Sequence, residues 1–242
     1  MQLIKLNAID STNDFLKDLS NKKDLVNFTV VVAENQTKGK GQMGAVWNVE
    51  SGKNLTMSVL VKGLMADIND IYKLNVAVAL AVIKALKQQH IPELAIKWPN
   101  DILSANKKIG GILIENSIKS YGSIVSVVGL GLNVNQMNFE NLPKASSLAI
   151  IMNHFFDKEM LLVDIVEAMK SSVSMLVAEP QKIWQEYENL LYKKGIPMAF
   201  ETKDSKKFMG IITGVSDSGK LQLLLEDDSV ALFEIKEIQM LY

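Results

Sequence analysis

The chain has 242 residues, of which 48% are hydrophobic and 22% charged, with a formal net charge of −1 at pH 7. This composition is typical of soluble globular proteins, and the length suits one large domain with a small appendage. The near-neutral charge gives no overall field for nucleic acid. The absence of cysteine excludes disulfides, thiolate metal ligands and a cysteine nucleophile. No signal peptide and no apolar span of about 18 residues is present, so we expect a cytoplasmic protein without a membrane anchor.

The first part of the chain predicts strands and one long helix. Ser11 followed by Asp14 fits a capping box and predicts a short helix to about residue 20. Apolar runs at 28–32 and 55–61 predict buried strands. Residues 67–89 repeat apolar side chains at intervals of three and four, which predicts a helix buried against a sheet.

The middle of the chain predicts strands that are joined by short turns. Strands are expected at 94–98, 102–103, 109–114 and 123–133, with a polar hairpin turn at 104–107. Because few helices separate these strands, we expect an α+β fold with a mainly antiparallel sheet rather than alternating βα units.

The C-terminal part changes from helices to short strands. Helices are expected at 146–156, 158–178 and 180–192, since Pro180 ends one helix and begins the next. From Gly195 onward, strands are predicted at 198–202, 207–215, 220–225 and 230–235. The pattern indicates a small β-barrel at 195–242, attached to a main domain at 1–194.

A glycine-rich loop follows the first predicted buried strand. Gly39, Gly41 and Gly44 lie close together, with Lys40 and Gln42 between them. Glycines let the backbone bring its N–H groups against a ligand, and a lysine suits a carboxylate or a phosphate. The cluster is equally compatible with a surface turn. A strand rather than a helix follows it, which excludes the dinucleotide fingerprint, and the protein-kinase motifs are absent.

Three further stretches place polar groups at predicted strand ends. They are KWPND at 97–101, KKIGG at 107–111 and GLGLN at 129–133. Together with the glycine loop they describe one cleft for an anionic ligand of nucleotide size. Simpler alternatives stay open, since Trp98 is also compatible with a core position and Asp101 with a turn cap.

The chain resembles the biotin–protein ligases, also called holocarboxylase synthetases or biotin–[acetyl-CoA-carboxylase] ligases, over nearly its whole length. Its motifs stand in the order typical of that family: DSTN at 10–13, ENQTKGKGQMGAVW at 34–47, KWPND at 97–101, KIGGILIE at 108–115, GLGLNV at 129–134 and ASSL at 145–148. The resemblance implies a catalytic domain related to class II aminoacyl-tRNA synthetases, followed by an SH3-like barrel.

The resemblance also implies a reaction in two steps. Biotin and MgATP give biotinyl-5′-AMP and pyrophosphate, and a lysine of a biotin carboxyl carrier protein then takes the biotinyl group. By the resemblance, magnesium would enter with ATP. A histidine metal cluster is not expected, because His90 and His154 lie far apart in the sequence. Family members that repress transcription carry a winged helix-turn-helix before the DSTN motif. Since this motif begins at residue 10, we expect a ligase without DNA-binding function.

By the same resemblance, one set of residues would bind biotin. Ser11, Thr12, Asn13 and Gln36 would hydrogen-bond the ureido ring and nearby atoms, and Gly111 would offer its backbone.

A second set would hold the carboxylate and the nucleotide. Its members, by implied role, are Gly39, Lys40, Gly41 and Gln42 over the biotin carboxylate and α-phosphate, Lys108 at the attacked phosphorus, Trp47 beside adenine, Lys97 and Asp101 on the phosphate side, and Asn133 near the phosphates or magnesium. We expect Lys108 to stabilise charge as the carboxylate attacks phosphorus.

The glycine loop departs from the family pattern, which commonly reads G-R-G-R-x-G-R. Lys40, Gln42 and Ala45 occupy the three arginine positions. A lysine keeps the charge without the planar fork, and the other two side chains carry no charge. We therefore expect the loop to hold the intermediate less tightly, with more of the burden on Lys40 and Lys108.

Other functions remain compatible with parts of the sequence. A lipoate–protein ligase shares the fold and reaction type, although not this arrangement of motifs. A non-catalytic biotin- or nucleotide-binding module and a DNA-binding repressor belong to other classes. The sequence leaves open whether the chain is a monomer or a homodimer.

Overall fold

The structure is a computed structural model that describes residues 1–242 except 48, 65–70, 119–122, 141 and 242. The strands of its larger sheet are β1 Leu3–Ile9, β2 Val30–Gln36, β3 Leu55–Lys62, β4 Ala95–Lys97, β5 Asp101–Ser104, β6 Lys107–Ile118 and β7 Ile124–Leu132. The helices are α1 Thr12–Lys22, α2 Ile71–Gln88, α3 Leu148–Met152, α4 Lys158–Ala178 and α5 Pro180–Asn189. The C-terminal strands are β8 Pro197–Thr202, β9 Lys207–Val215, β10 Leu221–Leu225, β11 Val230–Phe233 and β12 Ile238–Leu241.

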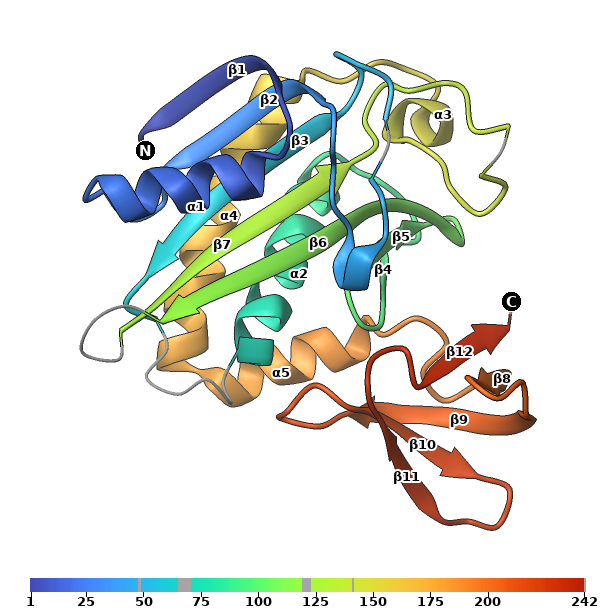
Figure 1. Cartoon of the computed structure of the whole chain (residues 1–242). Helices are drawn as coiled ribbons and strands as arrows, with labels where there is room; N and C mark the ends of the chain where they lie inside the picture. Colours follow the sequence, from blue (N-terminus) through green and yellow to red (C-terminus); the bar gives the residue numbers. More distant parts are fainter. Residues whose placement is uncertain (48, 65–70, 119–122, 141, 242) are drawn as a thin grey trace.

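The larger sheet has seven strands in the order β1-β2-β3-β7-β6-β5-β4 (Figure 1). The β1–β2 pair is parallel, and every other neighbouring pair is antiparallel. The prediction of an α+β fold with a mainly antiparallel sheet is therefore confirmed.

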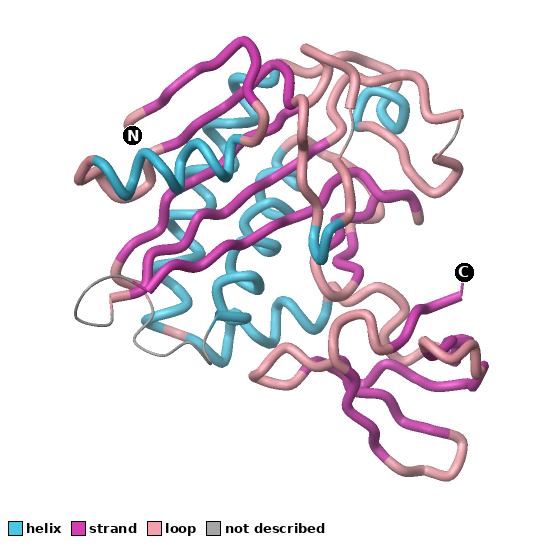
Figure 2. Tube along the Cα trace, in the orientation of Figure 1, coloured by secondary structure: helices cyan, strands magenta, loops and turns pink. Residues whose placement is uncertain are grey.

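Helices cover the two faces of this sheet (Figure 2). Strand β3 is buried from Leu55 to Val61, because α2 and α4 pack on one side of the sheet and α1 on the other. Met57 belongs to the core on the α2 side, whereas Leu60 packs with Leu16 of α1. The alternation of β3 side chains between two apolar layers explains why its sequence is almost continuously hydrophobic.

The predicted element boundaries hold best where caps define them. Helix α4 begins and ends at the predicted residues, since Asp157 caps its N-terminus and Pro180 follows its end. The predicted helix at 146–156 is wrong in length, because α3 ends at Met152 with Asn153 in the left-handed conformation. The predicted start of the long helix at 67–70 lies outside the described residues. Strands β1 and β12 were not predicted.

The C-terminal strands form a separate five-stranded sheet in the order β11-β10-β9-β8-β12. Hydrogen bonds of the described residues leave β11 and β12 at opposite edges, so this sheet is open and does not form a closed β-barrel. Ile212, Leu221 and Ile238 of this sheet belong to the same apolar core as α2 and β6. The C-terminal sheet therefore shares the apolar core of the main part of the chain. No helix among the described residues has the length and apolar character that crossing a membrane requires.

Candidate active site

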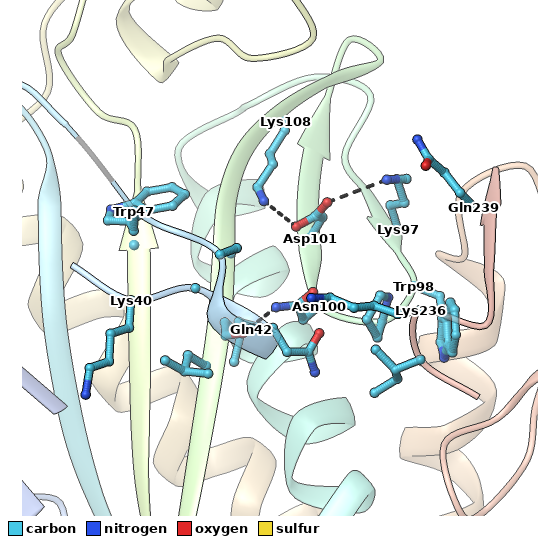
Figure 3. Close-up of a pocket in the computed structure, with 18 of the residues that line it drawn as sticks. Lys40, Gln42, Trp47, Lys97, Trp98, Asn100, Asp101, Lys108, Lys236 and Gln239 are labelled. Atoms are coloured by element: carbon cyan, nitrogen blue, oxygen red, sulfur yellow. Dashed lines mark hydrogen bonds and ion pairs between the residues drawn. The ribbon is translucent and has the colours of Figure 1, made fainter. Parts of the chain in front are cut away.

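A cavity of about 890 Å³ lies between the larger sheet, the glycine loop and the C-terminal sheet (Figure 3). Most residues that the sequence singled out line it: Ser11, Thr12, Asn13, Gln36, Lys40, Gly41, Gln42, Trp47, Lys97, Asp101, Lys108 and Gly111. Gly39 and Asn133 are not among the lining residues. The structure thus brings together segments that are far apart in the sequence.

The N-terminus of α1 delivers the first polar groups to this cavity. Ser11 caps the helix, because its Oγ accepts a hydrogen bond from the Asp14 N–H at 3.3 Å. The Asp14 carboxylate does not return to the cap as a capping box requires. It binds Lys40 Nζ at 2.6 Å instead, and this hydrogen bond raises the pKa of Lys40. The cap of α1 therefore also anchors the cation of the glycine loop.

A buried polar network continues from α1 into the sheet. Gln36 Oε1 accepts from the Thr12 N–H at 2.8 Å and from the Thr12 hydroxyl at 2.9 Å. Ser58 Oγ lies 2.8 Å from Thr12 Oγ1 and 2.6 Å from Asn13 Oδ1. The Ser58 hydroxyl is fully buried and has one proton, so it serves one of these two oxygens at a time.

The Asn13 side chain is the inner end of this network. Its Nδ2 donates to Glu115 Oε2 at 2.8 Å and to the Leu113 carbonyl at 3.3 Å. A Cβ on Gly129 would lie only 2.5 Å from Asn13 Oδ1, so this position requires glycine. Both ends of the Asn13 amide are thus committed to the protein, which fits a positioning role better than a direct ligand contact.

Charged side chains gather at the other end of the cavity. Asp101 Oδ1 binds Lys108 Nζ at 2.6 Å, and Asp101 Oδ2 lies 3.7 Å from Lys97 Nζ. Figure 3 shows the two lysines approaching Asp101 from opposite sides. The β5–β6 hairpin carries Asp101 and Lys108, whereas Lys97 ends β4. Ala105 and Asn106 at the hairpin tip both have positive φ angles, as a tight two-residue turn requires. The Lys108 side chain is 36% exposed, so its ammonium is accessible to an anion in the cavity.

Trp47, at the end of the glycine loop, forms one wall of the cavity. Its indole packs on Gly131, where a Cβ would lie 2.4 Å from the ring, and Lys108 Nζ lies 5.8 Å from the ring centroid. The buried Trp47 Nε1 has no hydrogen-bond partner among the described residues. A buried donor in a cavity wall without a partner marks a position where a ligand acceptor can bind.

Gly39 and Asn133 support the cavity from outside its lining. The Gly39 carbonyl accepts from the Trp47 N–H at 2.9 Å, which closes the base of the glycine loop. Asn133 Nδ2 donates to the Ser146 carbonyl at 3.0 Å and ties the end of β7 to the segment before α3. Their ligand roles stay predictions.

Trp98 joins the two sheets. Its Nε1 donates to the Gly219 carbonyl at 2.9 Å, at the tip of the β9–β10 turn, while the residue also lines the cavity. Tyr72 packs on the same glycine, and its hydroxyl lies 2.7 Å from the Tyr187 hydroxyl. Burial raises the pKa of both tyrosines, so this pair stays protonated and neutral.

Sequence reasoning missed several polar residues around the cavity, among them Ser58, Glu115 and Lys236. Ser58 was hidden inside an apolar run, although a serine in a fully buried strand is itself an uncommon signal. Glu115 ends one of the recognised motifs without an assigned role. Lys236 stands in a charged turn before an unpredicted strand, where no local pattern indicates a cavity.

Residues 6–135, more than half of the chain, match the model of the biotin/lipoate A/B protein ligase family. The chain belongs to this family. A bifunctional ligase/repressor BirA of Bacillus spizizenii is 33% identical over 136 residues, which cover 56% of this chain and 41% of that protein. A biotin–[acetyl-CoA-carboxylase] ligase of Mycobacterium tuberculosis is 27% identical, over 88% of this chain and 79% of that protein.

Solved structures of the family have the same fold. The biotin protein ligase of Aquifex aeolicus in complex with biotin and ATP superposes with a TM-score of 0.80 at 25% identity. The match covers 99% of this chain and 98% of that one. Both sheets of this chain therefore have counterparts in that enzyme.

Proposed function

We propose that this chain is an ATP-dependent biotin–protein ligase. One observation carries the proposal: most of the motif residues line a single cavity that has a neutral, hydrogen-bonded end and a cationic end. Such a cavity suits an acid with a polar uncharged head, a carboxylate and a nucleotide phosphate. The Aquifex relative that is similar over 99% of the chain binds biotin and ATP, which supports the same pair of substrates here.

In this proposal the neutral end binds the ureido ring. The Ser11 hydroxyl and Gln36 Nε2 offer donors to the ring carbonyl, while Thr12 Oγ1 offers an acceptor to a ring N–H. Asn13 holds this arrangement in place through Ser58 and the neighbouring sheet. The backbone of Gly111, opposite Gly131 in the sheet, forms part of the cavity wall.

The cationic end would carry the first chemical step. A biotin carboxylate oxygen attacks the α-phosphorus of MgATP, an acyl–phosphate bond forms, and pyrophosphate leaves. Lys108 lies where it can stabilise the negative charge that moves from the carboxylate to the phosphate oxygens, with Asp101 fixing its position. Lys40, Gly41 and Gln42 cover the reacting groups, Lys97 faces the phosphates, and Trp47 borders the adenine.

The second step would transfer the biotinyl group to a protein. A lysine amine of a biotin carboxyl carrier domain attacks the acyl carbon, an amide bond forms, and AMP leaves with loss of the amine proton. MgATP is the substrate, so the reaction needs no resident metal. Among the described residues, no group of three or more His, Cys, Asp or Glu side chains that could hold a metal ion is found.

The finer structural assignments belong to the same proposal. We propose that residues 1–194 form the catalytic domain with a class II aminoacyl-tRNA synthetase-like fold, and that residues 195–242 form an SH3-like unit. The change from helices to short strands after α5 supports this division. A cytoplasmic location, without binding to nucleic acid, is the setting in which we expect the enzyme to meet its carrier.

Biotin-dependent exchange of radiolabelled pyrophosphate into ATP tests the first step directly. We expect exchange with biotin but not with lipoate, and a loss of about 100-fold or more in Lys108→Ala, because the charge at the attacked phosphorus is then unbalanced. Lys107→Ala is the matched control, since Lys107 is the neighbouring lysine and does not line the cavity. Exchange with lipoate alone would show a lipoate ligase, and no exchange with either acid would favour a binding module.

A further inference from the structure

The C-terminal sheet contributes a lysine to the cavity. Lys236 lies in the turn between β11 and β12, is exposed, and lines the cavity. Its Nζ donates to the Met43 carbonyl of the glycine loop at 2.6 Å. Lys236 therefore spans from one sheet to the loop of the other, beside Gln42 (Figure 3).

Lys236 differs in its partner from the three cavity lysines of the main domain. Lys40 is paired with Asp14, and Lys97 and Lys108 are paired with Asp101. No carboxylate is paired with Lys236 among the described residues, and its ammonium rests on a neutral backbone carbonyl. Its ammonium is thus not held in an ion pair by any described residue, although the carboxylate-bearing Glu237 beside it in the chain also lines the cavity.

The glycine loop beside Lys236 lacks two of the cations that the family pattern would place there. Gln42 and Ala45 carry no charge, so beyond Lys40 the loop offers only backbone groups and neutral side chains to an anion. Met43 adopts a left-handed conformation, with φ 54° and ψ 40°, and its carbonyl points to Lys236. The cation at this part of the cavity comes from the C-terminal sheet instead.

We propose that Lys236 is a phosphate-binding residue of the ligase, which exchanges the Met43 carbonyl for a phosphate oxygen of ATP and then of the acyl-adenylate. An ammonium–phosphate hydrogen bond is charge-assisted and stronger than one to a neutral carbonyl. The flexible lysine stem allows the exchange without movement of the sheet. The inference rests on the proposed function for the identity of the anion. It assigns to the C-terminal sheet a direct part in binding the nucleotide.

Nucleotide affinity measured by titration calorimetry tests this assignment. The probe is an ATP analogue with a methylene bridge between the α- and β-phosphates, which binds without reacting. We expect Lys236→Ala to weaken its binding about tenfold and to leave biotin binding unchanged. Lys236→Arg should keep most of the affinity. Lys206→Ala is the matched control, because Lys206 is an exposed lysine between β8 and β9 that does not line the cavity.

A second variant separates phosphate binding from simple support of the loop. In Lys236→Ala combined with Gln42→Arg, a cation returns to the same place from the loop itself, so nucleotide affinity should recover. Unchanged affinity in Lys236→Ala, or loss of biotin and nucleotide binding together without recovery by arginine, would overturn the inference. Failure of the proposed function is distinguishable, since it would appear as absent pyrophosphate exchange in the unmodified chain.

Discussion

The two ends of the cavity are built in opposite ways. At the neutral end, Thr12, Asn13 and Ser58 are buried and hydrogen-bonded to one another. At the cationic end, Lys40 and Lys108 are 48% and 36% exposed and are held by carboxylates rather than by packing. The neutral end is therefore fixed before any ligand arrives, whereas the charged end can rearrange around one.

This difference fits the chemistry that each end would perform. Recognition of an uncharged ring requires hydrogen-bonding groups in fixed positions, because a mismatched buried donor or acceptor is costly. Phosphate chemistry passes from triphosphate to adenylate and then to AMP, so the cations must follow a changing charge. Exposed lysines can do so with little loss of energy, since exposed ion pairs contribute only about 0–1 kcal/mol.

Removal of Ser58 is expected to have the largest effect among the changes that separate the two ends. Ser58→Ala leaves the Thr12 and Asn13 oxygens in a buried site without their shared donor, a loss of about 1–3 kcal/mol. Biotin affinity should fall about 10- to 100-fold, while nucleotide affinity is unchanged. Calorimetric titration with each ligand gives both values.

Ser126→Ala is the matched control for that experiment. Ser126 is an equally buried serine on β7 that bonds Asn116 away from the cavity. It should reduce stability without changing biotin affinity. Equal losses of biotin affinity in the two variants would show that the Ser58 network has no special role at the neutral end.

Neutralising Asp101 should have a smaller effect at the charged end. Asp101→Asn keeps the shape but removes the charge that holds Lys108 at 2.6 Å, so the lysine spends less time at the reacting phosphate. We expect kcat for pyrophosphate exchange to fall about tenfold, with little change in the KM for biotin. Asp24→Asn breaks a similar but exposed pair with Lys62 and should leave exchange unaltered. A change confined to the KM for biotin would contradict the assignment.

Placing an arginine in the loop should have a still smaller effect at the charged end. Gln42→Arg adds a planar, permanently charged donor beside the phosphate, so the acyl-adenylate should escape several-fold more slowly. Release of labelled biotinyl-5′-AMP from the enzyme, followed by filter binding, measures this rate. Ala45→Lys adds a charge at another loop position and tests whether location matters. An unchanged off-rate in Gln42→Arg would show that other groups already hold the anion.

The sequence predicted residues within local motifs better than residues that reach the cavity through distant contacts, for a physical reason. Ser11, Thr12 and Asn13 form a helix cap, which is a local device that can be recognised from adjacent residues. Lys236 reaches the cavity only because β12 pairs with β8 and the C-terminal sheet packs on the main core. The residues next to Lys236 in the sequence show no pattern that predicts either contact.

The missed strands have a similar explanation. Strand β1 pairs with β2 alone and only in parallel, with Leu3 opposite Val30, so its formation depends on a segment far along the chain. Its side chains are mostly half-buried or exposed, and they give no clean alternation of apolar and polar residues. Strand β12 is also an edge strand. Central strands such as β3, which are buried on both faces, have continuous apolar runs and were therefore predicted.

The link between the sheets gives the smallest expected effect and bears on both ends of the cavity. Trp98→Phe keeps an aromatic ring but removes the hydrogen bond from Nε1 to the Gly219 carbonyl. We expect the free energy of unfolding to fall by about 1 kcal/mol, as measured by urea titration. If this bond also holds the C-terminal sheet in register with the cavity, nucleotide affinity should fall slightly while biotin affinity stays constant. That split would follow from Lys236 being on the C-terminal sheet and the biotin-binding network being on the other. A loss of biotin affinity instead would mean that Trp98 acts on the neutral end through the cavity wall.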